Sequence, residues 1–115
     1  MSVLRGLTVR WSLADAPDGV EQRLADYVAD TSYDRFSALP DLAFKTWRMV
    51  PGEWFEGCYV FADEAARLAF QESFTAGAAD APGSLIIGSA PILIEPCAVV
   101  AIAEGGAGFH PAARA

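Results

Sequence analysis

Four side chains with acid–base or anion-binding chemistry are concentrated in one aromatic-rich stretch, Leu42–Ala62. Lys45 and Arg48 supply cations, Tyr59 supplies a phenol and Glu56 supplies a carboxylate. A buried lysine near a carboxylate could hold a phenolate or an enolate. A tyrosine hydroxyl beside a guanidinium can orient a carbonyl and stabilise an oxyanion. Lys45, Arg48 and Tyr59 are therefore the candidate catalytic residues.

Aromatic side chains around these groups are candidates for the walls of a pocket. Trp47 follows Lys45 by two residues, so both side chains share one face of a strand, where the indole could stack on a planar substrate. A structural alternative stands beside each assignment: a salt bridge at a subunit interface for Lys45, an exposed strand end for Arg48, and a satisfied core hydroxyl for Tyr59. The candidate substrate-binding residues are Trp11, Tyr27, Phe44, Trp47, Glu56 and Phe70.

The spaced motifs of common cofactor sites are absent from the sequence. It has no phosphate loop, dinucleotide fingerprint or nucleophile elbow. Cys58 and Cys97 lie far apart without zinc-type spacing, and the only histidine, His110, sits in a Gly- and Pro-containing tail. We therefore expect no metal and no cofactor, and we interpret both cysteines as buried thiols of a cytoplasmic protein.

Composition predicts one folded domain that binds neither nucleic acid nor membrane. Hydrophobic residues make up 53% of the 115 residues, and 15 acidic residues outnumber 8 basic ones. Nucleic acid and anionic membranes need a concentrated positive surface, which this chain lacks. The N-terminus lacks the pattern of a secretory signal. The apolar run Leu85–Ala103 approaches the length of a membrane span, but Pro91, Glu95 and Pro96 interrupt it, which favours buried strand.

Hydrophobic periodicity predicts the order strand, helix, strand, strand, helix, strand. Asp15 or Asp18 could cap the first helix, Asp63 could cap the second and Gly77 could end it. The apolar pattern of the first helix weakens after Thr31. The predicted elements are a strand over 3–12, a helix over 20–31, two strands within 42–62, a helix over 63–77 and one or two strands within 84–103.

This order is that of a ferredoxin-like βαββαβ fold in the α+β class. It predicts an antiparallel four-stranded sheet with two helices on one face and the first strand between the third and the fourth. The predicted domain spans 1–103, and 104–115 form a flexible C-terminal tail. The other sheet face is not polar enough for water, so we expect a homodimer.

The hairpin turn decides which side chains share a face. Pro51 and Gly52 occupy the central positions of a type II turn. With a two-residue loop, one face of the sheet carries Lys45, Trp47 and Glu56 together, and the other carries Phe44, Arg48 and Tyr59. A longer loop would shift these partners by one residue.

Three segments, Leu39–Asp41, Phe44–Trp47 and Gly57–Glu64, resemble the YdhR-type family of small mono-oxygenases in the dimeric α+β barrel superfamily. The likeness lies in a Lys-x-Trp strand, a hairpin, and a Gly-x-Tyr-x-Phe strand that runs into an acidic helix start. Asp41 and Glu56 depart from the glycines that are frequent there. The resemblance implies a homodimeric barrel with a pocket between sheet and helices.

The same resemblance implies cofactor-independent mono-oxygenation of a hydrophobic aromatic or polyketide-like metabolite. The alternatives are a small-molecule-binding or structural homodimer without turnover, or a cyclase or isomerase on the same fold. A cavity of about 300 Å³ or more, reached by Lys45, Arg48 or Tyr59, would favour an enzyme.

Overall fold

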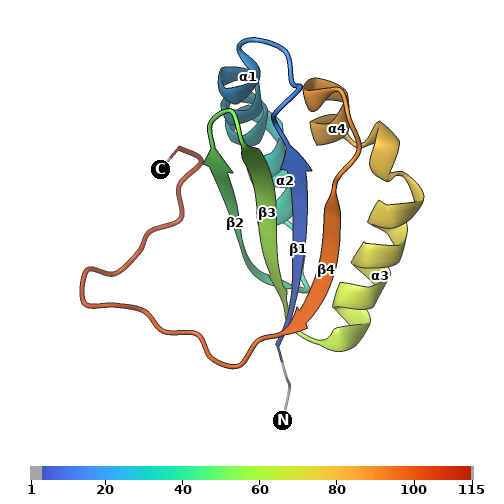
Figure 1. Ribbon diagram of the computed structural model, residues 1–115. Helices are drawn as coiled ribbons and strands as arrows, with labels where there is room; N and C mark the ends of the chain where they lie inside the picture. The colour runs from blue at the N-terminus through green and yellow to red at the C-terminus, as the bar shows by residue number, and fades with distance from the viewer. Residues whose placement is uncertain (1–3, 115) are drawn as a thin grey trace.

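A computed structural model describes residues 4–114 as a four-stranded antiparallel sheet backed by helices (Figure 1). The strand order is β2-β3-β1-β4, so the predicted ferredoxin-like fold and the central place of the first strand are confirmed. Val3, the first residue of the predicted strand 3–12, lies outside the described residues. The strands are β1 (Arg5–Ser12), β2 (Leu42–Val50), β3 (Trp54–Phe61) and β4 (Leu93–Ala98); the helices are α1 (Val20–Tyr27), η1 (Val28–Ser32), α2 (Tyr33–Ser37), α3 (Glu64–Ala76), η2 (Ala78–Asp80) and α4 (Pro82–Ile87).

One face of the sheet packs against the helices and forms the core. Side chains alternate between the two faces along each strand, so every second residue points toward the helices. On β1 these are Leu7, Val9 and Trp11, all buried, and on β3 they include Phe55 and Tyr59. Helix α2 packs on β2, whereas α3 packs on the other three strands. The space between these two helices and the sheet is where a pocket can form.

The first helical run continues beyond its predicted end at residue 31. Its buried residues recur at every fourth position: Val20, Leu24, Val28, Ser32 and Phe36. A regular α-helix has 3.6 residues per turn, so this spacing would rotate steadily off one face. The π-helical segment η1 has wider turns, which compensates for the drift and keeps all five positions on the sheet.

Helix capping follows the prediction at one helix and departs from it at the other. Asp63 caps α3, with its carboxylate accepting a hydrogen bond from the Ala66 amide at 2.8 Å, as predicted. The prediction for α1 was wrong, because Gly19 is its N-cap and neither Asp15 nor Asp18 caps it. Gly19 has φ +80°, a conformation that glycine adopts without steric cost.

The segment 84–103 is not strand throughout, which corrects the prediction. Pro82 occupies the first turn of the short helix α4, and Gly88 ends that helix in the left-handed conformation at φ +90°. Only Leu93–Ala98 forms a strand, and it is an edge strand, where Pro96 is tolerated. Between residues 4 and 114, no helix has the length and apolar character needed to cross a bilayer.

The hairpin register differs by one residue from that of a two-residue loop. Gly52 has φ +77° and the Glu53 amide donates to the Val50 carbonyl at 2.9 Å, as a type II turn requires. Strand pairing nevertheless begins at Val50 with Trp54, so the loop has three residues. The shift reverses the expected partners: Lys45 faces Tyr59, Trp47 faces Gly57, and Arg48 faces Glu56.

The described tail beyond residue 98 contains no helix or strand. It arcs away from the end of β4 and returns to the side of α1 (Figure 1). There the Arg114 guanidinium forms an ion pair of 3.1 Å with Asp26. Three large apolar side chains along it are exposed: Val100, Ile102 and Phe109.

Candidate active site

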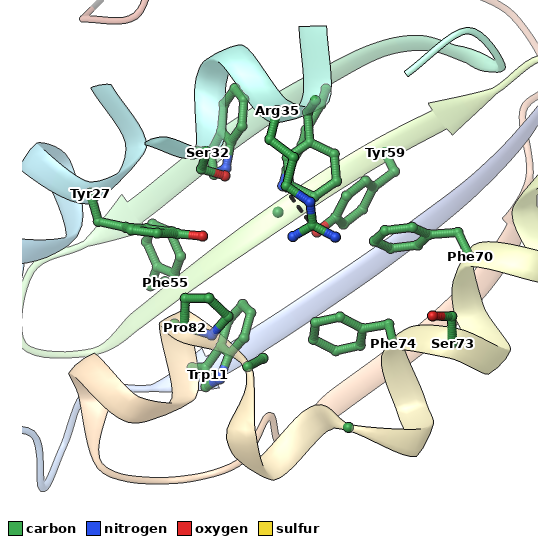
Figure 2. Close-up of a pocket in the computed structure, with 17 residues that line it drawn as sticks. Trp11, Tyr27, Ser32, Arg35, Phe55, Tyr59, Phe70, Ser73, Phe74 and Pro82 are labelled. Atoms are coloured by element: carbon green, nitrogen blue, oxygen red, sulfur yellow. Dashed lines mark hydrogen bonds between the residues drawn. The ribbon is translucent and has the colours of Figure 1, made fainter. Parts of the chain in front are cut away.

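A pocket of about 230 Å³ lies between the helices and the inner face of the sheet (Figure 2). Every element except β4 and α4's last turns contributes to its rim or walls, and most of the lining is aromatic. The volume is below the 300 Å³ expected, although Lys45 and Tyr59 both reach the pocket. The lining residues are Trp11, Tyr27, Ser32, Arg35, Phe36, Lys45, Trp47, Phe55, Gly57, Tyr59, Phe70, Ser73, Phe74, Gly77, Ala81, Pro82 and Gly83.

Lys45 and Tyr59 form the polar centre of the pocket. They lie directly opposite each other on β2 and β3, with Lys45 Nζ 3.0 Å from the Tyr59 hydroxyl oxygen. Gly57 makes room for this pair. A Cβ at position 57 would lie 3.1 Å from both Lys45 Cε and the Tyr59 ring, tighter than ordinary van der Waals contact. The glycine at 57 therefore allows a lysine and a tyrosine to meet inside an aromatic pocket.

Burial makes the charged form of Lys45 unfavourable. The ammonium would lie over the rings of Phe36 at 3.4 Å, Tyr59 at 4.2 Å and Trp47 at 4.5 Å, and such cation–π contacts contribute roughly 0.5–2 kcal/mol each. Removal from water costs several kcal/mol per ion. Desolvation is the larger effect, and together with the nearby charge of Arg35 it places the pKa of Lys45 well below its ordinary value.

No acidic side chain among residues 4–114 forms an ion pair with Lys45. Burial likewise raises the pKa of Tyr59, which keeps its phenol protonated. The site therefore combines an amine shifted toward its neutral form with a neutral hydroxyl in hydrogen-bond contact. A neutral buried amine can act as a general base or as a nucleophile, and the hydroxyl can relay a proton.

Aromatic rings enclose this pair from several elements. Phe36 lies at the centre, with its ring centroid 5.4 Å from Tyr59, 5.8 Å from Phe70 and 6.2 Å from Trp47, each at a steep angle. Figure 2 shows Tyr27, Phe70 and other rings facing the same space. Such edge-to-face contacts hold the walls in place, and their ring faces can pack against a flat ligand.

Trp11 is held by its own hydrogen bond. Its indole Nε1 donates to Ser84 Oγ at 2.9 Å, and that hydroxyl donates to the Ala78 carbonyl at 2.6 Å. Gly83 lets the indole approach closely, since a Cβ there would lie 3.2 Å from the ring. The ring therefore forms a fixed wall at the end of the pocket away from Lys45.

Three predicted site residues lie on the opposite face of the sheet. Arg48 and Glu56 form an ion pair there, and Arg10 Nη2 lies 2.8 Å from the second Glu56 oxygen. Phe44 pairs with Val60 beyond a bulge in β2, which places it on that face too, at 38% exposure. Their placement beside Lys45 or Tyr59 was wrong, because the three-residue loop reverses the relation between the faces of β2 and β3.

The carboxylate of Glu56 is fully buried under its arginine partners. Burial raises the pKa of Glu56, but hydrogen bonds and charges from Arg10 and Arg48 outweigh it and lower the pKa below its ordinary value. Arg10 also stacks over Trp54, with the guanidinium carbon 4.2 Å from the ring centroid. This cluster is an ion-paired patch on the open face and contributes nothing to the pocket.

Six predicted residues do line the pocket: Lys45, Tyr59, Trp11, Tyr27, Trp47 and Phe70. Sequence reasoning missed several lining residues, chiefly Arg35, Phe36 and Phe55. The repeat of buried residues at every fourth position from Val20 would have identified Phe36. Within residues 4–114, no three His, Cys, Asp or Glu side chains are grouped as a metal site would need.

Comparisons with known proteins support the fold and give no activity. No family model matches the chain, and no curated protein matches it in sequence. Among solved structures, the chain is similar to the crystal structure of NE2512, a protein of unknown function from Nitrosomonas europaea. The TM-score is 0.65 at 27% sequence identity, covering 90% of this chain and 96% of that one. The α+β fold is thus shared over nearly the whole length of both proteins.

Proposed function

We propose that this protein is a small cofactor-independent mono-oxygenase that acts on a hydrophobic aromatic molecule of one or two rings. The observation that carries the proposal is the contact of the Lys45 amine with the Tyr59 hydroxyl inside an aromatic pocket. A cavity of about 150 Å³ accommodates benzene. The 230 Å³ found here suits one or two fused rings better than a larger polyketide.

In the proposed reaction, Lys45 removes an acidic proton from a phenol or an enolisable CH2 group. The Tyr59 hydroxyl donates to the resulting oxyanion, and the aromatic walls exclude water. The electron-rich anion supplies the electrons that reduce O2. Where a CH2 group becomes C=O, one oxygen atom enters the product, the other leaves as water, and no external reductant is needed.

The test is oxygen uptake with a panel of naphthols, hydroquinones and related one- and two-ring phenols. Uptake by the wild type, with one atom of ¹⁸O2 in the product, and its loss in Lys45→Met would support the proposal. Arg48→Met is the matched control, because Arg48 lies on the other face and should leave turnover unchanged. Ligand binding without uptake would instead favour the alternative of a small-molecule-binding protein.

We further propose a homodimer that covers the open face of the sheet. The helices all lie behind the other face (Figure 1), and the ion-paired patch of Arg10, Arg48 and Glu56 lies on the open one. Arg48 and Phe44 are exposed there. Arginine and aromatic side chains are enriched at protein interfaces. Light scattering at micromolar concentration should report twice the chain mass; a monomer would contradict this proposal.

A further inference from the structure

Lys45 is chemically singular in this protein. It is the only lysine in the sequence, and it lies inside the pocket. Lysines that serve only solubility lie in water and pair with carboxylates. This one has three aromatic rings around its amine and no carboxylate partner among residues 4–114. A lone amine in an apolar pocket is the arrangement that activates a lysine as a nucleophile toward carbonyl compounds.

A second cation faces the same space. Arg35 lines the pocket from α2, and Figure 2 shows its guanidinium directed toward Tyr59. None of the carboxylates described between residues 4 and 114 pairs with it. It is close enough to act electrostatically on both Lys45 and Tyr59. A guanidinium at the edge of an apolar pocket binds carboxylates in a bidentate manner.

We propose that the pocket captures a one-ring aldehyde or ketone that carries a carboxylate, as a covalent imine on Lys45 with the carboxylate on Arg35. The aromatic walls hold the ring, and the volume admits one ring with its two substituents. This chemistry shares the pocket with the proposed oxygenation but consumes no oxygen, so either activity can fail while the other stands.

The reaction is a condensation that balances without a co-reactant. The Lys45 lone pair attacks the carbonyl carbon and forms a C–N bond. One amine proton passes to the carbonyl oxygen through the Tyr59 hydroxyl, which accepts one proton and donates another. Loss of water from this carbinolamine leaves the imine, so that R–NH2 and R′CHO give R–N=CHR′ and H2O.

The test is reductive trapping of the wild-type protein at neutral pH. Benzaldehyde and 4-carboxybenzaldehyde are each added with sodium cyanoborohydride, and the adducts are located by mass spectrometry. As Lys45 is the only lysine, the α-amino group is the internal reference. We expect labelling of Lys45 in the folded protein, at a rate at least about tenfold higher with 4-carboxybenzaldehyde than with benzaldehyde.

Two comparisons separate a built site from ordinary lysine reactivity. In urea, labelling of Lys45 should fall more than about tenfold relative to the α-amino group, because an exposed lysine is protonated at neutral pH. Arg35→Gln should abolish the preference for the carboxylated aldehyde, whereas Arg23→Gln, an exposed arginine outside the pocket, should keep it.

The outcomes that overturn the proposal are equally specific. Labelling of the α-amino group without labelling of Lys45 in the folded protein contradicts imine formation. Lys45 labelling that rises on unfolding contradicts activation by the pocket. Equal rates with both aldehydes, or a preference that survives Arg35→Gln, contradicts the carboxylate site.

Discussion

Lys45 and Tyr59 face each other across the β2–β3 pair with 3.0 Å between the amine nitrogen and the hydroxyl oxygen. This contact exists because the β2–β3 loop has three residues and because position 57 has no side chain. The two polar atoms lie among aromatic rings, where a charge is poorly solvated and an amine favours its neutral form. The functional proposals depend on this pair.

Lys45→Met should change how stability depends on pH. Burial lowers the pKa of Lys45 in the folded state, so between that pKa and the unfolded value near ~10.4 the unfolded chain binds more protons. The Lys45 contribution to the free energy of unfolding therefore rises with pH across this window. The stability of Lys45→Met relative to wild type should fall by at least about 1 kcal/mol from pH ~7 to pH ~10.5. Urea titrations measure both proteins, and parallel pH curves would contradict the buried amine.

Gly57→Ala should damage the pocket with a modest effect on the rest of the fold. The new methyl group would press on Lys45 Cε and on the Tyr59 ring, at a cost of roughly 1–3 kcal/mol. We expect Lys45 trapping to fall several-fold and the melting temperature to drop. Gly106→Ala is the matched control, because open space surrounds that position. Trapping at the wild-type rate in Gly57→Ala would show that the close approach is unimportant.

Glu56→Gln should weaken the open face and spare the pocket. The carboxylate is present above its unfolded pKa, near ~4.3, and its stabilising effect is lost as pH falls through the depressed folded pKa. Because Arg48 is more than half exposed, we expect a loss of only about 1–2 kcal/mol at neutral pH. The variant should also have a flatter acid limb. The exposed Glu53→Gln serves as control, and equal losses in both variants would rule out the ion-paired patch.

Trp47→Ala should weaken binding of flat ligands. The indole lines the pocket beside Lys45, and its loss removes one aromatic wall. We expect the Kd for 2-naphthol to rise roughly tenfold by calorimetry. Trp54→Ala, a truncation on the other face, should leave that Kd unchanged. Unaltered affinity in Trp47→Ala would refute the stacking role.

The fold could be predicted from sequence because its signals are local. Alternation placed Leu7, Val9 and Trp11 on one face, and Asp63 announced the start of α3. The pairing of faces was not local: it depended on whether Glu53 belongs to the loop or to the strand. One residue of difference exchanged the partners of Lys45 and left the turn chemistry of Pro51 and Gly52 as predicted.

The site was only partly predictable for a related reason. Lys45, Tyr59 and Trp47 were singled out by residue type, and all three line the pocket. Phe36 was missed because the search used a 3.6-residue period, whereas a π-helical segment changes the period before it. The helix α4 was missed because Leu85–Ile87 is rich in residues that favour strands; Pro82 and Gly88 are the signals that delimit it.

The most direct test is the pKa of Lys45 itself, measured by NMR. As the sequence contains one lysine, ¹³C labelling at lysine Cε gives a single resonance that can be followed from neutral pH upward. Burial among Phe36, Trp47 and Tyr59 predicts a titration midpoint well below the ordinary value of about 10.4, and a return to that value in urea. A folded protein in which Lys45 titrates at or above about 10.4 would contradict the reactive amine on which both proposals rest.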